Sequence, residues 1–329
     1  MSFLRKKSVG LHLSSDAIRL AVLYKKGKQI TAGLFHTEPL TEDVVKDGKI
    51  RDYQKLKKLL LSLKKKVEHP ERGRGTRFDK VNFSFDHPES DLFKEIKIKI
   101  LWFEEEAPAA VRAILPAVED KELNLRIRDK GLGISNPVML VDIGSDRTIV
   151  SVVTNGKIDY CEKLQISSSF IKDLIERGWG LDLFTEEINK HYLDWHLKVT
   201  EARKHKNTES TKIQKQGLAS NWNLHFSPST NQDLVKDKGL KINNIILYGS
   251  ALFYPCQSVK DTCLSVLPEY LMANLKVPVE LANVWTNVIP SSAKASQGAP
   301  SFDDKIPSIS FNDSLGYATA IGLALKGFE

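Results

Sequence analysis

Two stretches decide the fold: Val9-Gly-Leu-His-Leu-Ser-Ser-Asp-Ala-Ile-Arg-Leu-Ala-Val-Leu23 and Met139-Leu-Val-Asp-Ile-Gly-Ser-Asp-Arg-Thr-Ile-Val-Ser-Val-Val153, which lie 130 residues apart. Each runs from a strand rich in β-forming residues through a short Ser/Asp turn into a second such strand. The repetition predicts a duplicated fold with two lobes and a cleft between the matching turns. The copies differ in the turn itself, because the second contains Asp142-Ile-Gly144 where the first reads His12-Leu-Ser14.

The composition is that of an ordinary folded protein. The chain has 329 residues, of which 41% are apolar and 27% charged, enough for two domains with their own cores. Apolar stretches such as 242–254 are too short and too interrupted to cross a bilayer, and the N-terminus lacks the apolar core of a signal peptide. We therefore expect a cytoplasmic protein. Its three cysteines, Cys161, Cys256 and Cys263, lack metal-like spacing and fit free thiols in a reducing compartment.

Each repeat opens a unit with the element order β-β-β-α-β, which is typical of an RNase H-like sheet. In the first unit we predict strands at 8–13, 18–24, 29–37 and 80–85 and a helix at 52–67. In the second unit we predict strands at 138–143, 148–153, 158–165 and 243–248 and a helix at about 168–177. The sequence therefore predicts an α/β fold built from two RNase H-like lobes.

The predicted lobes take most of the chain. The first comprises residues 1–92 and is completed by a C-terminal helix at 313–329, whose glycines and alanines suit a close-packed seam between the lobes. The second comprises residues 137–312. Each lobe would carry one of the two turns, so a ligand in the cleft would contact both.

Two insertions are predicted outside these sheets. Residues 93–136 are predicted to form a small subdomain with a strand at 95–100 and a helix at 104–115. Residues 201–238 are polar and basic, which predicts a long flexible insertion in the second lobe.

The net charge of +7 comes largely from runs of lysine. Such a surface attracts nucleic acid or anionic lipid. In the helix predicted at 52–67, however, the lysines lie opposite an apolar face, which indicates a solvated helix surface; that face comprises Leu56, Leu59, Leu60, Leu63 and Val67. Asp52 is the predicted N-cap. Basic and aromatic residues do not alternate along the chain, so nucleic acid is not an expected partner.

Three motifs could contact a nucleotide. A turn entered through Asp142-Ile-Gly144 can present backbone N–H groups to a phosphate, and the Asp142 carboxylate can hold Mg²⁺. Gly249 and Ser250 follow a predicted strand and could lie against adenine and ribose, or form a plain strand-to-helix turn. Glu187 and Lys190 share a helix face, where they could contact ribose and adenine or simply pair with each other.

The order of these motifs resembles the actin-like ATPase superfamily and, within it, the PilM family of type IV pilus assembly proteins, which is related to the division protein FtsA. The resemblance spans nearly the whole chain. The stretches that carry it are 3–10, 44–50, 141–145, 275–283 and 315–328. It implies two lobes around a nucleotide cleft.

The resemblance also implies a binding site for ATP and Mg²⁺. It assigns Ser14, Ser15 and Asp16 to the first phosphate loop, Asp142, Gly144, Ser145 and Asp146 to the second, Asp142 to the metal, and Glu187, Lys190, Gly249 and Ser250 to the adenosine. The chain departs from the family at His12-Leu13-Ser14, where Asp-Ile-Gly is usual, and nitrogen ligands suit Mg²⁺ poorly. Serines at 167–169 replace a usual glycine pair. Weak, degenerate ATP binding with little hydrolysis is therefore expected.

The function implied is that of a scaffold in the type IV pilus assembly platform. PilM-like proteins bind the cytoplasmic N-terminal peptide of a bitopic inner-membrane protein of the PilN type, so the chain would associate peripherally with the inner membrane through such a partner. An active ATPase or kinase of the same superfamily is an alternative. A cytoplasmic component of a type II secretion platform is another, although that relative continues into a transmembrane helix and none follows Glu329. Self-association is left open.

Overall fold

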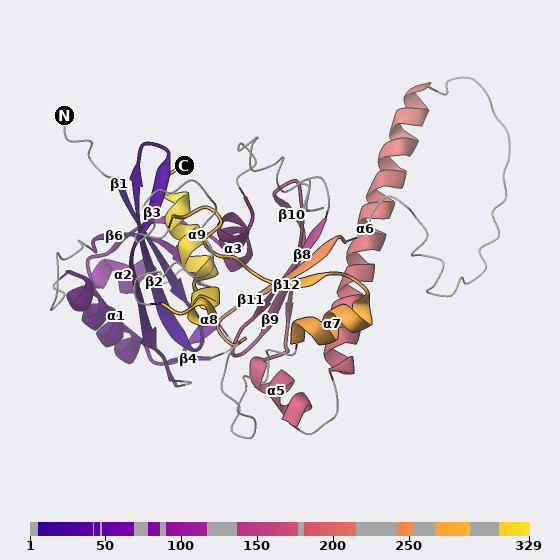
Figure 1. Ribbon diagram of the computed structural model, residues 1–329. Helices are drawn as coiled ribbons and strands as arrows, with labels where there is room; N and C mark the ends of the chain where they lie inside the picture. The colour runs from indigo at the N-terminus through magenta and orange to yellow at the C-terminus, as the bar shows by residue number, and fades with distance from the viewer. Residues whose placement is uncertain are drawn as a thin grey trace.

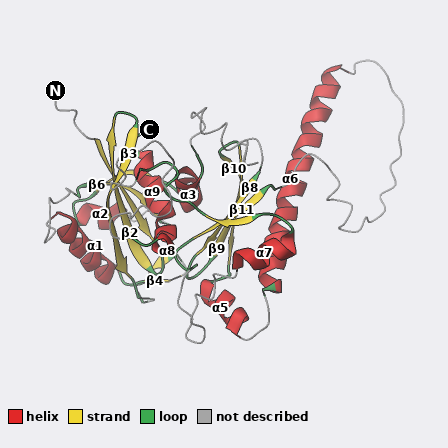
Figure 2. Ribbon diagram, in the orientation of Figure 1, coloured by secondary structure: helices red, strands yellow, loops and turns green. Residues whose placement is uncertain are grey.

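The computed structural model describes residues 6–41, 43–46, 48–68, 78–85, 90–116, 137–176, 181–214, 242–252, 267–289 and 309–329. Two α/β lobes lie side by side, each built on a twisted sheet with helices packed around it (Figures 1 and 2). The predicted α/β fold class is confirmed.

The two sheets have the same topology. The first has the strand order β3-β2-β1-β6-β7 and the second β10-β9-β8-β11-β12. In both sheets the three leading strands pair antiparallel and the last two are parallel additions. The strands of the first sheet are β1 (Lys6–Leu13), β2 (Ala17–Lys26), β3 (Gln29–Pro39), β6 (Lys80–Ser84) and β7 (Lys99–Phe103). Those of the second are β8 (Val138–Ile143), β9 (Thr148–Thr154), β10 (Lys157–Leu164), β11 (Asn244–Tyr248) and β12 (Val279–Leu281). The predicted duplication is therefore confirmed at the level of the sheets.

Alternation along β1 decides which residues face the cleft side of the first sheet. Val9, Leu11 and Leu13 join the core under α1 (Tyr53–Glu68). The intervening Ser8 and Gly10 face the opposite side, against α9 (Ala318–Lys326). Because the side-chain period of a strand is two, His12 also belongs to this second face, at the end of the strand where the turn begins.

The amphipathic helix predicted at 52–67 is confirmed as α1. Its buried residues are Leu56, Leu60, Leu63 and Val67, and the Lys55 amide donates to the Asp52 carboxylate at 2.8 Å, as an N-cap requires. A small hairpin precedes it, formed by β4 (Val45–Lys46) and β5 (Lys49–Ile50). The lysine-rich face points away from the sheet, as the pattern predicts.

The strand predicted at 95–100 is wrong in position. Residues 90–95 form the short helix α2 (Ser90–Glu95), the chain then turns at Lys97 with φ 55°, and the strand is β7. β7 pairs with β6 of the first sheet, and the next helix, α3 (Glu106–Ile114), packs on α9. The described part of this segment therefore extends the first lobe. Residues 117–136 lie outside the described residues, so the domain boundaries stay predictions.

The insertion predicted at 201–238 is wrong in its first part. Helix α6 (Asp182–Gln214) continues through it and projects beyond the second lobe in Figure 1. The sequence 201–214 lacks proline and glycine, so nothing in it breaks a helix that has already started. Residues 215–238 lie outside the described residues. Among the described helices, none is both long and apolar enough to span a membrane, because α6 is long but polar.

Two further helices, α5 (Ser168–Glu176) and α7 (Leu267–Leu275), complete the second lobe. The C-terminal segment enters the seam as α8 (Phe311–Ser314), a 3₁₀ turn (Leu315–Tyr317) and α9. The single helix predicted there is thus interrupted, and its N-cap is Ser310, whose hydroxyl accepts from the Asp313 amide.

The seam between the lobes is close-packed. Any Cβ at Gly322 would overlap the Ala109 carbonyl of α3, and any Cβ at Gly10 would overlap the Ala320 carbonyl, so these two glycines let α9 approach both neighbours. One apolar core runs from β2 and β3 through α3 and α9 into the second sheet. The seam therefore holds the two turns in fixed relative positions.

Candidate functional site

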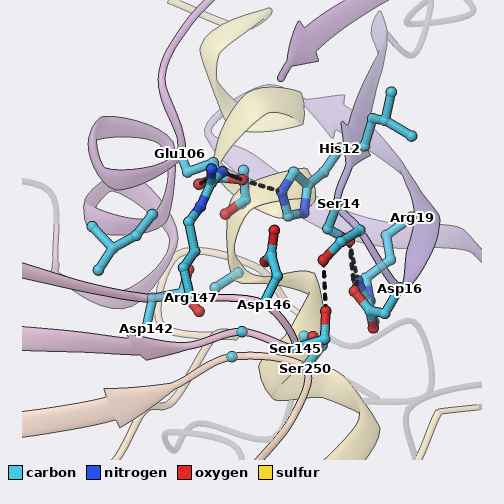
Figure 3. A pocket seen from close by; sticks show the side chains of 18 of the residues that line it. His12, Ser14, Asp16, Arg19, Glu106, Asp142, Ser145, Asp146, Arg147 and Ser250 are labelled. Carbon is cyan, nitrogen blue, oxygen red and sulfur yellow. Dashed lines mark hydrogen bonds and ion pairs between the residues drawn. The ribbon is translucent and has the colours of Figure 1, made fainter. Parts of the chain in front are cut away.

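A pocket lies where the two repeated turns meet, beside the first residues of α3 and α9 (Figure 3). It brings together nine of the eleven predicted site residues: Ser14, Ser15, Asp16, Asp142, Gly144, Ser145, Asp146, Gly249 and Ser250. Its lining also includes residues that were not predicted, among them Arg19, Glu106 and Arg147.

The two turns close in the same way. The Ser14 amide donates to the Ala17 carbonyl at 3.0 Å, and the Gly144 amide donates to the Arg147 carbonyl at 2.9 Å, which are equivalent positions of the repeat. The turns also touch, since the hydroxyls of Ser15 and Ser145 lie 2.7 Å apart. Equivalent residues of the two copies therefore meet across the cleft.

The negative charge of Asp16 in the first turn is compensated by a residue of the same hairpin. Arg19, on β2, forms an ion pair with Asp16 and donates a hydrogen bond to the Ser14 hydroxyl at 2.8 Å. Burial alone would raise the pKa of Asp16, but the charge and hydrogen bond of Arg19 and the hydrogen bond of Ser14 lower it to about 2. The carboxylate of the first turn is thus charged and already paired.

The positive charge of Arg147 in the second turn is compensated by a residue of α3, the helix that links the lobes. Glu106, buried at the start of α3, lies 3.0 Å from His12 Nε2 and 3.2 Å from Arg147 Nη2. Burial would raise the pKa of Glu106, but its hydrogen bond to His12 and the charges of His12 and Arg147 lower it to about 2. Glu106 therefore ties the first lobe to the second (Figure 3).

Asp142 lies on the floor of the pocket, partly accessible from it but deep in the protein. Burial, followed by the negative charge of Glu106, raises its pKa well above the usual range, although Arg147 and Arg19 oppose the shift. The chain at Gly249, with φ 120°, passes so close that a Cβ there would overlap the Asp142 carboxylate and the Ile143 backbone. Burial and Glu106 therefore both disfavour the charged form of Asp142 in this closed arrangement.

Comparisons with known proteins agree with this geometry. No protein-family model and no curated protein sequence matches the chain. Among solved structures, it is similar to the ethanolamine utilization protein EutJ from Carboxydothermus hydrogenoformans, with 16% identity, a TM-score of 0.51, and coverage of 97% of this chain and 89% of that one. It is also similar to a PilM-PilN type IV pilus biogenesis complex, with 15% identity, a TM-score of 0.52, and coverage of 99% and 100%.

The chain has the actin-like ATPase fold. The similarity covers nearly all of it, and the duplicated sheets with a cleft at their turns are the core of that fold. At these identities the likeness concerns the fold and not one family within it. We call the pocket of Figure 3, which lies between the two lobes at the turns of both sheets, the actin-like cleft.

The actin-like cleft, as arranged, does not fit a Mg²⁺-bound nucleotide. Its cavity volume is about 40 Å³, whereas pockets for ligands of this size take roughly 300–1,000 Å³. Burial and the negative charge of Glu106 raise the pKa of Asp142, which disfavours the carboxylate form that Mg²⁺ requires. Among the residues that the structure describes, no cluster of three His, Cys, Asp or Glu side chains is placed to hold a metal ion.

Two predicted site residues lie elsewhere. Glu187 and Lys190, on α6, do not line the pocket and form an ion pair at 3.2 Å. Glu187 also lies 3.1 Å from His191 Nε2, and His191 Nδ1 lies 2.6 Å from the Tyr160 hydroxyl of β10. In this arrangement they fasten α6 to the sheet, and their contact with an adenosine stays a prediction.

Glu106 is the main site residue that the motifs did not identify. Three consecutive glutamates precede the apolar part of α3, and pattern alone singles out none of them as buried. A signal was present, because Glu106 shares a helix face with Ala110 and Ile114, which are buried. Arg147 and Arg19 had no comparable signal, since their pairing depends on tertiary contacts.

Proposed function

We propose that this chain is an actin-like scaffold protein with a degenerate nucleotide cleft, which acts in a type IV pilus assembly platform at the inner membrane. It binds the cytoplasmic N-terminal peptide of a bitopic membrane protein of the PilN type. ATP binds weakly at most, and its hydrolysis is not the function of the protein.

The observation that carries this proposal is that the arginines of the cleft are already paired with its carboxylates. Arg19 is paired with Asp16, and Glu106 lies between His12 and Arg147. Phosphoryl transfer depends on cations and metal ions that are free to stabilise charge on the transferred phosphate. A cleft whose arginines already neutralise carboxylates, and whose turns are hydrogen-bonded to each other, supports a fixed two-lobed frame.

The choice of platform rests on the comparison with the PilM-PilN complex. The matched chain in that structure is covered over its whole length, and the structure is that of a complex with a second protein. The stretches at 44–50 and 315–328 support the same family from the sequence. Peripheral attachment to the inner membrane would follow from the partner.

An active ATPase is the second candidate. It is favoured by one observation, namely that the pocket gathers four carboxyl groups at the meeting of the turns: Asp16, Glu106, Asp142 and Asp146. If the lobes opened, Asp142 would be exposed to solvent, burial would no longer raise its pKa, and its carboxylate could hold Mg²⁺.

The test combines nucleotide and peptide binding. The purified chain is titrated with ATP and Mg²⁺ by calorimetry, and with a synthetic peptide of the cytoplasmic N-terminus of a bitopic protein encoded in the adjacent reading frame. We expect the peptide to bind without nucleotide and phosphate release to stay at the buffer rate. Steady release at about 1 s⁻¹ or faster that is lost in Asp142→Asn, but kept in the exposed control Asp159→Asn, would establish the ATPase instead.

A further inference from the structure

The outer strand of the first sheet carries an exposed apolar strip. Leu101, Trp102 and Phe103, three consecutive residues of β7, are 46%, 56% and 40% exposed. β7 stands last in the sheet order, and among the described residues only β6 pairs with it. Trp102 lies on the α9 side of the sheet, beside Lys326, and Phe103 lies near Phe83 on the α1 side, so apolar surface is exposed on both faces of this edge. Exposed apolar surface of this kind marks an interaction site.

The strip lies on a strand edge, where proteins normally avoid such residues. Free strand edges are usually protected by lysines, bulges or very short strands, because they can pair with another chain. β7 has one bulge, where the register with β6 shifts at Leu101, and one lysine, Lys99. Neither removes the apolar surface, so the edge is only partly protected.

The strip is held in place by its neighbours. The Lys326 ammonium of α9 lies over the Trp102 ring, 5.5 Å from its centre. The turn before β7 is fastened by Lys64, which donates to the carbonyls of Ile96 and Lys97. A surface whose side chains are fixed before binding loses less entropy when a partner is bound.

The charges at the start of β7 point to an acidic partner. Lys80 and Lys99 lie directly opposite each other in the β6–β7 register, and Lys97 lies two residues before Lys99. All three side chains are exposed, and no described carboxylate forms an ion pair with any of them. Like charges placed opposite each other on a sheet are unfavourable unless something compensates them.

A second copy of the chain would compensate them poorly. Antiparallel pairing of two β7 strands would bring these lysines to the far end of the other strand, where Glu104 and Glu329 are already paired with Arg112. The chain also carries a net charge of +7, so two copies repel each other. A different protein with acidic residues fits the edge better.

We propose that the outer edge of β7, which no other described strand pairs with, binds an extended segment of a partner protein in which acidic residues adjoin β-branched or aromatic ones. The segment adds a strand to the first sheet, its apolar side chains cover Leu101, Trp102 and Phe103, and its carboxylates face Lys80, Lys97 and Lys99. The inference rests on the proposed scaffold function, for which it supplies a binding surface, but it can fail or hold independently of the pilus assignment.

Peptide selection tests the proposal without a known partner. Random 12-residue peptides displayed on phage are selected in parallel on the full chain and on the variant Lys97→Glu/Lys99→Glu. We expect the full chain to enrich peptides with Asp or Glu beside β-branched or aromatic residues, and the variant to lose the acidic preference. A synthetic peptide of the selected sequence should bind at least tenfold more weakly to Trp102→Ser and when its backbone amides are N-methylated.

The controls separate this surface from others. Leu183→Ser removes an equally exposed residue, at 56%, from α6 of the second lobe and should leave peptide binding unchanged; circular dichroism verifies that each variant is folded. The proposal is wrong if no peptide is enriched, if enriched peptides bind Trp102→Ser equally well, or if the wild type is a dimer that Trp102→Ser converts to a monomer. Binding of the membrane-protein peptide by Trp102→Ser would refute this surface and leave the scaffold function intact.

Discussion

The two turns of the repeat have the same backbone and different charges. Both close with an equivalent hydrogen bond, and Ser15 and Ser145 occupy matching positions that touch. The residues just before the turns differ, because β1 has His12 at the position where β8 has Asp142. The strand pattern around a turn thus maintains the fold while the side chains in it are free to change, which is how a site can lose its chemistry without losing its architecture.

The charges of the turns are also compensated in different ways. Asp16 of the first turn pairs with Arg19 of the same hairpin, so that pair depends on one lobe alone. Arg147 of the second turn pairs with Glu106, which lies outside both hairpins and also contacts His12. The first pair stabilises a hairpin, whereas the second stabilises the closed cleft.

Among substitutions at the two turns and their partners, removal of Glu106 should lower the stability of the protein most. Glu106→Ala leaves His12 and Arg147 facing each other without the carboxylate between them, and we expect the free energy of unfolding to fall by about 3 kcal/mol. Urea denaturation at pH 7 measures it. The matched control is Glu105→Ala, which removes an exposed neighbour and should change stability by no more than about 0.5 kcal/mol. Equal losses in the two variants would show that Glu106 does not close the cleft.

Acidification should remove the stability that the charged carboxylate of Asp16 in the first turn contributes. The pKa of Asp16 is about 2, against a usual value of 3.8, so its contribution to stability is present above about pH 4 and is lost as the pH falls toward 2. The difference corresponds to about 2 kcal/mol. Since pH 2.5 is still above the folded-state pKa, only part of this contribution, more than about 1 kcal/mol, is lost between pH 7 and pH 2.5, and the loss of stability over that range should be smaller by this amount in Asp16→Asn than in the wild type.

Asp146→Asn is the control for that measurement. Asp146 occupies the equivalent position in the second turn, and no described cation forms an ion pair with it. Its acid-induced loss of stability should match that of the wild type. If both variants behaved alike, the internal pairing of the first turn would not be its distinguishing property. Glu106, whose pKa is also about 2, contributes the same acid-dependent stability in the wild type and in both variants.

Much of the fold could be predicted because local pattern and tertiary structure agree in it. The strand periods around both turns and the apolar face of α1 appear in the structure nearly where the sequence places them. Prediction failed where the local sequence pattern carries no signal of the structure. The strand predicted at 95–100 is misplaced because Lys97 adopts a left-handed backbone conformation, which its residue type does not indicate. The sequence predicts a flexible segment at 201–214 because a polar helix has no apolar face from which it could be recognised.

The site was partly predictable for the same reason. Residues of the two turns and of the stretch after β11 could be assigned because each motif lies in continuous sequence, and the nine residues so assigned meet in the pocket. Glu187 and Lys190 could not be placed, since a carboxylate and a lysine at this helical spacing pair with each other as readily as with a ligand. Glu106 and Arg147 come together only through the fold, so no motif in one stretch contains both.

The contact between equivalent serines should have the smallest effect and the most specific one. Ser15→Ala and Ser145→Ala each remove one partner of a partly buried hydrogen bond, and each should cost about 1 kcal/mol of stability. Because the two hydroxyls bond to each other, the double variant should cost less than the sum, with a coupling of about 0.5–1 kcal/mol. Pairing Ser15→Ala with Ser169→Ala, whose hydroxyl contacts Ser167 instead, should give no coupling. A coupling of zero between Ser15 and Ser145 would mean that the turns do not touch in solution, which would favour the second candidate, an ATPase whose lobes open.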